Sequence, residues 1–261
     1  MSNTYLSFIT DDDLNECIEF LYNRYEDALK GIDYNKFFKN RIDTFKMTFD
    51  TKINNLSEEA WLSAELQRQV EKTITNHIGT FHEMLIGKIE GYTNHPSGHK
   101  YDVSKDDGTL YAEIKNKHNT VTGTHVINLF NKIKEYADQH PNAICYYVRI
   151  IDKCSQNKIW KFTTGDIDKK TGKKPEYSHD RIRIISGDEF YKIVAGYDNA
   201  FKDLNKVIPI ALSNFIKQKH ASQGSSMGLF AQLYNKSIKN QRSLYEEIVE
   251  INYKKSNYLG Y

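Results

Sequence analysis

The sequence predicts an α/β protein with a mixed central sheet flanked by helices, and three observations support this. The middle of the chain reads as strand, strand, helix, strand, strand, which favours a mixed sheet covered by helices. Residues 143–151, AICYYVRII, form a nearly continuous apolar run that is typical of a strand buried on both faces. Helical spacing of apolar residues dominates both ends of the chain, so helical segments are expected to flank the sheet.

The first ninety residues predict three helices. They are expected at 11–29, 34–53 and 57–89, with starts at Thr10/Asp11 and Ser57 and a stop at Gly31. The apolar side chains recur at helical spacing, and we expect them to form core rather than a ligand site. In the second helix they are Phe37, Phe38, Ile42, Phe45 and Phe49, and in the third Ile74, Ile78, Phe81, Leu85 and Ile86.

Beyond residue 90 the predicted elements alternate. A polar loop at 91–99 precedes two short strands, and then a helix at 122–140 and strands at 143–151 and 158–163 follow. A basic loop spans 164–177. Ser186 and Glu189 fit the S-x-x-E pattern of a capping box that opens a helix. Further helices are expected at 199–219 and 229–250, joined by a connector at 220–228.

Length and composition bound the domain organisation. The 261 residues suffice for one large or two small domains, and 39% hydrophobic content supports a sizeable core. No clean boundary is visible. We therefore expect a single domain over 1–261, with a helical part at 1–70, a core at 71–200 and a second helical part at 201–261.

The expected compartment is the cytoplasm. No run of eighteen apolar residues is present to span a membrane, and the N-terminus lacks the basic and apolar regions of a signal peptide. Cys17, Cys145 and Cys154 match neither a disulfide framework nor a zinc motif.

Charge is unevenly distributed along the chain. The net charge is only +2, but residues 1–60 hold seven Lys or Arg and twelve Asp or Glu, whereas 199–261 hold nine and four. A nearly neutral total can thus hide a basic face for nucleic acid. Ordinary fluctuation along a chain explains the pattern equally well.

The most informative stretch is residues 100–120, KYDVSKDDGTLYAEIKNKHNT. An Asp-Gly turn at Gly108 separates two extended runs, which predicts a hairpin that brings Asp102 beside Glu113. Because side chains alternate along a strand, Glu113 and Lys115 share one face, and Ile114 points to the other face and anchors the strand in the core.

Two carboxylates and one ammonium in a single patch suit metal-assisted cleavage of a phosphodiester. Hard divalent cations such as magnesium take one or two carboxylates together with substrate phosphate. A lysine can orient the attacking water and stabilise charge on the phosphate. The alternative is a solvated ion pair, which is common where an acid and a lysine share an exposed strand face.

The layout D-x(10)-E-x-K resembles the PD-(D/E)xK nuclease core. The strings HEMLIG and EIKNKHNT resemble a family of type II restriction endonucleases that cut GG-any-CC or GG-(A/T)-CC sites. The stretches IWKFTTGD and DRIRIISGDEFYKIVAGYDNAFKDL are also similar to that family, so the resemblance covers roughly residues 75–210. The sequence departs from the motif before the first acid, where Tyr101 replaces proline.

The resemblance implies a restriction-endonuclease-like fold and a magnesium-dependent enzyme that hydrolyses double-stranded DNA to leave 5′-phosphates. It implies metal binding by Asp102, Glu113, Ile114 and Glu83, and a catalytic role for Lys115 beside these acids. Glu83 lies on the predicted third helix, where it can also be an ordinary surface glutamate. A palindromic target implies a two-fold homodimer, since the symmetry of the DNA is mirrored by the protein.

Several polar residues are candidates for DNA contact. They are Asn116, Lys117, His118 and Asn119 for phosphates near the scissile bond, Lys173 with Lys169, Lys170 and Lys174 for other phosphates, and Arg181 and Arg183 for guanine. The alternatives are a solvated strand end for 116–119, and arginines that hold acids such as Asp180 or Asp188. A zinc site from His77, His82, His95 and His99 is not expected, because His77 and His82 are five residues apart and do not share a helix face.

Two other interpretations stay open at this point. The first is a nuclease that reads DNA structure, such as a junction resolvase or a repair enzyme. The second is a protein of the same fold that binds DNA or a partner without catalysis, although an intact set of two acids and a lysine argues against it.

Overall fold

A computed structural model describes residues 3–30, 32, 34–96, 98–165, 167, 172–219, 236–243 and 247–248 of the chain. It divides into two compact units, the first made of Met1–Leu21 and Asn76–His220, and the second of Tyr22–Thr75 and Ala221–Tyr261. Helices α1 (Asp11–Lys30) and α4 (Glu58–Gly87) contribute residues to both units. This division does not test the expectation of a single domain, which stays a prediction.

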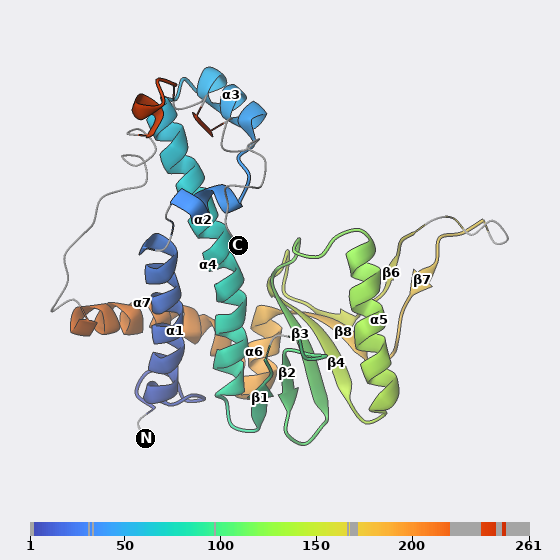
Figure 1. Ribbon diagram of the computed structural model, residues 1–261. Helices are drawn as coiled ribbons and strands as arrows, with labels where there is room; N and C mark the ends of the chain where they lie inside the picture. Colours follow the sequence, from blue (N-terminus) through green and yellow to red (C-terminus); the bar gives the residue numbers. More distant parts are fainter. Residues whose placement is uncertain are drawn as a thin grey trace. The chain divides into compact units, whose positions relative to one another are not determined.

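A six-stranded mixed sheet forms the centre of the first unit (Figure 1). Its spatial order is β1-β2-β3-β4-β8-β5, in which the pairs β3–β4 and β4–β8 are parallel and the other pairs are antiparallel. The strands are β1 (Tyr92–Asn94), β2 (Val103–Lys105), β3 (Leu110–Lys117), β4 (Ile144–Ile151), β8 (Ile182–Ser186) and β5 (Asn157–Ile159). The predicted α/β class with a mixed central sheet is confirmed.

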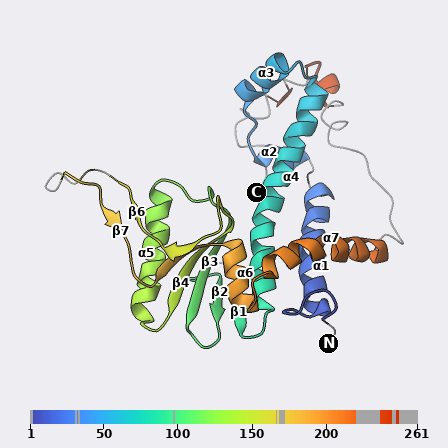
Figure 2. The ribbon, with the colours of Figure 1, turned by 180° about the vertical axis from the view of Figure 1, so that it is seen from behind.

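Helices cover both faces of this sheet (Figures 1 and 2). Helix α5 (Thr124–Gln139) connects the parallel strands β3 and β4 and packs on one face through Leu129, Phe130 and Ile133. On the other face lie α6 (Gly187–Ala195), α7 (Ala200–Lys219), and the parts of α1 and α4 that belong to this unit. A parallel pair needs such a crossover helix, so the sheet order and the position of α5 are linked.

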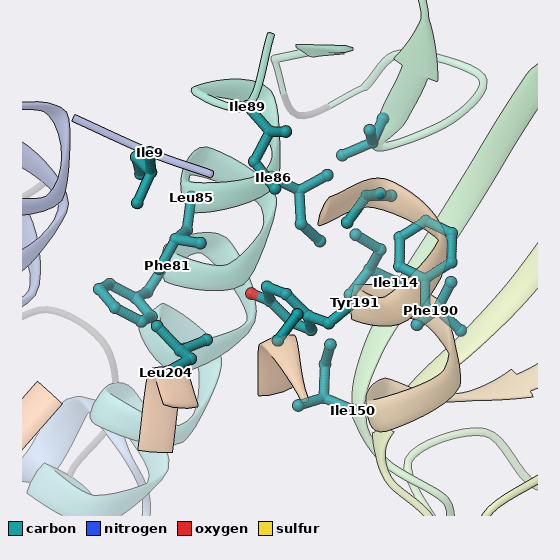
Figure 3. Packing of buried hydrophobic residues seen from close by; sticks show 14 of the residues in the cluster. Ile9, Phe81, Leu85, Ile86, Ile89, Ile114, Ile150, Phe190, Tyr191 and Leu204 are labelled. Atoms are coloured by element: carbon teal, nitrogen blue, oxygen red, sulfur yellow. The ribbon is translucent and has the colours of Figure 1, made fainter. Parts of the chain in front are cut away.

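The larger core lies on the face opposite α5 (Figure 3). Ile114 of β3 and Ile150 of β4 meet Tyr191 of α6 and Phe81 of α4 there. The predicted anchoring of β3 by Ile114 is confirmed, since its side chain is buried. His82, next to Phe81, lies within hydrogen-bonding distance of the Tyr191 hydroxyl through Nδ1, at 2.9 Å, and burial lowers the pKa of His82 to about 4.

The second unit has its own small core. Helices α2 (Tyr34–Lys39) and α3 (Thr44–Ile53) contribute to it together with part of α4. Its buried side chains are Phe37, Phe38, Ile42, Met47, Trp61, Leu62 and Ile248.

The predicted helix at 34–53 is wrong in one respect, because it is two helices. The chain breaks at residues 40–43, and the Asp43 carboxylate caps α3 by accepting a hydrogen bond from Lys46 N at 2.9 Å. The break changes which face of α3 turns inward, so Met47 is buried while Phe45 and Phe49 are 75% and 63% exposed. The expectation that these two phenylalanines are core is therefore wrong. The predicted cap at Ser57 is confirmed, since its Oγ accepts a hydrogen bond from Ala60 N.

After β4, the structure differs from the prediction at two further elements. The expected strand at 158–163 is split into β5 and β6 (Phe162–Thr163), and β6 pairs with β7 (Glu176–Tyr177) in a separate two-stranded sheet. The expected capping box does not form, because the Ser186 hydroxyl makes no hydrogen bond to a backbone N–H of α6. It accepts a hydrogen bond from Gln156 N instead, at 3.0 Å, which ties β8 to the loop before β5.

The C-terminal predictions are tested only in part. Helix α7 confirms the predicted helix at 199–219. The connector 220–228 and most of the predicted helix at 229–250 lie outside the described residues. Within the described part, 236–239 are helical but 240–243 are not, so a continuous helix over 229–250 is wrong. Among the described helices, none is both long enough and apolar enough to cross a membrane.

Gly187 is required by close packing between α6 and β4. A Cβ atom built at this position would collide with the backbone carbonyl oxygen of Ile150 and lie 2.9 Å from its Cα. Because both obstructing atoms are backbone, a larger residue cannot be accommodated by a side-chain rotation. We expect Gly187→Ala to lower the free energy of unfolding by about 2 kcal/mol, despite the better helix propensity of alanine.

Gly79 in α4 provides a matched control. Apart from its chain neighbours and the backbone of its own helix, no described heavy atom lies within 4 Å of its built Cβ. Gly79→Ala should therefore raise the free energy of unfolding by about 0.5–1 kcal/mol. Urea unfolding of both variants measures these changes. A Gly187→Ala protein as stable as the Gly79→Ala protein would contradict the close-packing interpretation.

Candidate active site

The hairpin of β2 and β3 brings the two candidate acids together. The strands pair in the register Val103↔Ala112, so Asp102 lies just before β2 and opposite the middle of β3. Gly108 closes the turn with a φ of 72°, a conformation that glycine adopts without strain, and its N–H donates to Lys105 O. The predicted hairpin is confirmed.

Asp102 is held by the backbone of β3. Its Oδ2 accepts a hydrogen bond from Ile114 N at 2.7 Å, while its own N–H donates to Ala112 O at 3.0 Å. Burial raises the pKa of Asp102, and the nearby Lys115 ammonium opposes that rise. The carboxylate is thus fixed in direction by a strand that also carries the second acid.

Three oxygen atoms from this hairpin surround the Lys115 ammonium. Its Nζ lies 2.8 Å from Glu113 Oε1, 3.0 Å from the main-chain oxygen of Ile114 and 3.6 Å from Asp102 Oδ2. Burial lowers the pKa of Lys115, but the charges of Asp102 and Glu113 outweigh it, so the net shift is upward. The three oxygen atoms therefore stabilise a positive charge at the position of the Lys115 ammonium.

The carboxylate of Glu113 is almost removed from water, with its side chain 8% exposed. Its second oxygen, Oε2, accepts a hydrogen bond from Lys132 Nζ of α5 at 2.7 Å. Both oxygens of one buried carboxylate are thus bound by an ammonium. Such pairing is required, because a buried charge without a partner is strongly destabilising.

Glu83 of α4 belongs to the same electrostatic cluster. Burial, helped by the charges of Asp102 and Glu113 and opposed by that of Lys115, raises the pKa of Glu83 to about 7. Functional acids are often found in such surroundings, where burial and neighbouring carboxylates bring the pKa of a carboxyl group close to neutral pH.

The donor set fits a hard divalent cation such as magnesium. Two carboxylate oxygens and one carbonyl oxygen already converge on a single positive charge, and magnesium prefers oxygen ligands of this kind. Within the described part of the chain, no group of three or more His, Cys, Asp or Glu side chains is arranged to hold a metal ion. A divalent cation at this site would therefore need the Ile114 carbonyl as a ligand in addition to the two carboxylates.

The four residues after Lys115 differ in their burial. Asn116 is buried with its Oδ1 unpaired, and His118 has a buried, unpaired Nδ1, whereas Lys117 and Asn119 are exposed. Their predicted contact with phosphates is not tested and stays a prediction.

Arg181 and Arg183 both have partners within the protein. Arg181 donates to the main-chain oxygens of Ala137 and His140 at the C-terminal end of α5. Arg183 donates to the side chain and the main chain of Asn157, across the β5–β8 pair. Each arginine therefore has a structural role within the protein, in addition to the contact with guanine that the sequence predicted. That contact is not tested and stays a prediction. The acids proposed as alternative partners, Asp180 and Asp188, are not among these contacts.

The predicted basic loop is described only in part. Lys173 and Lys174 are exposed, but Lys169 and Lys170 lie outside the described residues. The phosphate contacts predicted for this loop stay predictions.

Lys132 was missed by the sequence reasoning. It lies seventeen residues after Lys115, within an amphipathic helix, and no motif includes it. Lys132 lies between Leu129 and Ile133, at the boundary of the apolar stripe of this helix. This position is the one sequence signal that could have pointed to a role for Lys132 at the site.

Taken together, the six-stranded mixed sheet and the acid, acid, lysine arrangement define a nuclease of the restriction-endonuclease-like class. The model of the Eco47II restriction endonuclease family matches residues 6–217. The chain is 67% identical to the type II restriction enzyme Sau96I of Staphylococcus aureus, over the full length of both chains. It is 31% identical to the type II restriction enzyme Eco47II of Escherichia coli over 226 residues, which cover 85% of this chain and 92% of that enzyme.

The chain therefore belongs to the Eco47II restriction endonuclease family. It is a type II restriction enzyme, a metal-dependent and site-specific deoxyribonuclease that binds double-stranded DNA. The predicted resemblance to this family of type II restriction endonucleases is confirmed, and the two other interpretations are set aside.

Glu83 predicts a pH dependence of stability. Its pKa is about 7 in the folded protein and near 4.5 in an unfolded chain. Between these values the folded protein holds a proton that the unfolded chain has lost, so the contribution of Glu83 to stability falls as pH rises from about 4.5 to 7. Below about pH 4.5 the free energy of unfolding no longer depends on the ionisation of Glu83, and above about pH 7 its decrease is complete.

The substitution Glu83→Gln removes this titration. In chelator, the variant should become more stable relative to the parent protein across this window, by up to about 3 kcal/mol at pH 8. Urea unfolding at pH 5, 6, 7 and 8 measures the difference. A difference that stays constant from pH 5 to pH 8 would show that the carboxyl group is not perturbed.

Proposed function

We propose that the chain hydrolyses DNA at a magnesium site made of Asp102, Glu113 and the main-chain oxygen of Ile114, with Lys115 as the catalytic cation. Glu83 supports this site from α4. The observation that carries the proposal is the convergence of these three oxygens on one positive charge, at 2.8, 3.0 and 3.6 Å. A cation of higher charge would be bound by the same oxygens.

The reaction forms a bond between a water oxygen and phosphorus and breaks the bond from phosphorus to the 3′ oxygen. The products are a 5′-phosphate and a 3′-hydroxyl, and the water loses one proton. Magnesium, when bound, supplies a Lewis acid that lowers the pKa of water and offsets charge on the phosphate. The residues of the chain must orient the water and stabilise the phosphate.

Lys115 is suited to the phosphate because it is a flexible point charge at the centre of the site. Its side chain is 27% exposed, so its ammonium can turn from Glu113 towards a bound phosphate. Glu83, with a pKa of about 7, can accept a hydrogen bond from the attacking water or take up the proton that it loses. Asp102 keeps its direction through Ile114 N while these groups move.

We propose that the target is a short palindromic site of the GG-any-CC or GG-(A/T)-CC kind. The support is the resemblance at EIKNKHNT together with the relatedness to the two type II enzymes named above. The central pair would then be read loosely or through DNA shape. The exposed Lys117, Asn119 and Lys173 would contact phosphates, which position the protein without specifying sequence.

A palindromic site also leads us to propose a homodimer, in which each protomer cuts one strand. The compartment that we propose is the cytoplasm, where the three free cysteines of the chain stay reduced.

The direct test is digestion of a long duplex in magnesium, followed by sequencing of the fragment ends. Discrete fragments whose ends share one GG…CC site support the proposal. Discrete fragments that share another site would refute the target but not the nuclease. A smear, or cutting only of branched DNA, would contradict site-specific cleavage.

Two substitutions test the catalytic roles. Glu113→Gln and Lys115→Met should each slow cleavage by at least about a thousandfold, because each removes a charge on which several kcal/mol of transition-state stabilisation depend. DNA binding should survive, since affinity comes mainly from many phosphate contacts. Single-turnover cleavage and gel-shift binding measure the two effects.

Glu135→Gln is the matched control, because this exposed glutamate of α5 undergoes the same chemical change away from the site. It forms a surface ion pair with Lys100 at 3.0 Å. Its cleavage rate should stay within twofold of the parent. Wild-type turnover by Lys115→Met would remove this lysine from the mechanism.

The proposed dimer has its own test. Light scattering should give the mass of two chains, about 61 kDa from a chain of 30.4 kDa, for the free protein or for its complex with a cognate duplex after subtraction of the DNA. A single active site would have to turn round to cut the second strand, so a dimer should cut both strands in one binding event. One chain per duplex in both measurements would rule out the homodimer.

A further inference from the structure

Lys132 contacts the candidate metal site without belonging to the motif that defines it. Its ammonium binds Glu113 Oε2 at 2.7 Å, and its side chain is 38% exposed. It reaches the site from α5, whereas Asp102, Glu113 and Lys115 all come from the β2–β3 hairpin and the residue before it. A second structural element therefore acts on the glutamate.

The geometry divides the two oxygens of Glu113 between two lysines. Oε1 accepts a hydrogen bond from Lys115, whose ammonium also contacts the Ile114 carbonyl and Asp102, and Oε2 accepts one from Lys132. With Oε2 held by α5, the carboxylate cannot rotate freely, and one oxygen is presented to the point where the other two oxygens converge. Partners that orient a metal-binding carboxylate in this way affect metal sites strongly.

The charges of the four residues that are in direct contact are balanced without any metal. Asp102 and Glu113 supply two negative charges, and Lys115 and Lys132 supply two positive charges. Lys115 is on the side of Glu113 where the metal would bind, and it can swing away. Lys132 is on the other side and would remain close to a bound divalent ion, which it repels.

We propose that Lys132 is a positioning residue that fixes the Glu113 carboxylate for catalysis and, as its internal counter-ion, weakens metal binding. The proposal rests on the assignment of Glu113 as a metal ligand. It predicts two effects of opposite sign when the lysine is lost. Metal should bind more tightly because a repelling charge is gone, yet cleavage should slow because the carboxylate is free to rotate.

The test uses the full-length protein and Lys132→Met, which keeps most of the length of the side chain but removes the charge and the hydrogen bond. Manganese binding without DNA is followed by the EPR signal of the free ion. We expect the dissociation constant to fall about tenfold, as the loss of a nearby unit charge implies. Single-turnover cleavage at saturating magnesium should slow by about 10- to 100-fold.

Two controls make these results specific. Lys134→Met changes the same residue type on the same helix, where the side chain pairs with Asp138 at 2.6 Å, and it should alter neither quantity. Lys132→Arg retains the charge and a donor, so its manganese affinity should stay near that of the parent and its cleavage rate should exceed that of Lys132→Met. A purely structural role would lower both affinity and rate, and neither would rise.

Unchanged or weaker manganese binding by Lys132→Met would overturn the proposal, and so would an unchanged cleavage rate. A urea midpoint close to that of the parent confirms that the variant is folded, and Lys132→Gln provides a second neutral variant if it is not. A DNA affinity whose salt slope falls by about one unit, with manganese binding unchanged, would make Lys132 a phosphate contact instead.

Glu113→Gln separates this inference from the proposed function. If it leaves manganese binding unchanged, the metal site itself is wrong. If it abolishes manganese binding while Lys132→Met has no effect, the metal site holds and only the role of Lys132 fails.

Discussion

The burial of the Glu113 carboxylate is the constraint on which the rest of this site depends. A carboxylate that is 8% exposed must be compensated, and two lysines from different elements supply the compensation. Lys115 comes from the same strand two residues later, whereas Lys132 comes from the helix that crosses over the sheet. The site therefore requires β3 and α5 to keep a fixed relation, which the apolar contacts of α5 with the sheet provide.

Strand β3 performs two tasks at once because its side chains alternate. Ile114 turns to the core formed with α4, α6 and α7, while Glu113 and Lys115 turn to the face covered by α5. The backbone between them also takes part, since Ile114 N holds Asp102 and Ile114 O faces the Lys115 ammonium. A shift of one residue in the pairing of β2 with β3 would separate these groups, so the hairpin register is part of the chemistry.

The predicted DNA-contacting residues are the part of the site that the sequence determines least. The guanidinium of Arg181 holds the end of α5, and that of Arg183 holds β5 against β8, so both are explained by the fold alone. A basic residue on a strand gives the same sequence signal whether it binds a carbonyl of its own chain or a base. Phe45 and Phe49 show the same limit for apolar residues, because their spacing did not reveal that the helix breaks before them.

The sequence by itself determined the class of fold, the hairpin with its Asp-Gly turn, and the family, because these depend on local periodicity, turn chemistry and a short motif. It also predicted that Glu113 and Lys115 share a face, which follows from the period of a strand. Only the tertiary structure decided that Lys132 lies against Glu113 and that the Ser186 hydroxyl accepts a hydrogen bond from Gln156 N rather than from a backbone N–H of α6. These contacts join residues that are 19 and 30 positions apart, and such pairs are set by the packing of whole elements rather than by any local pattern.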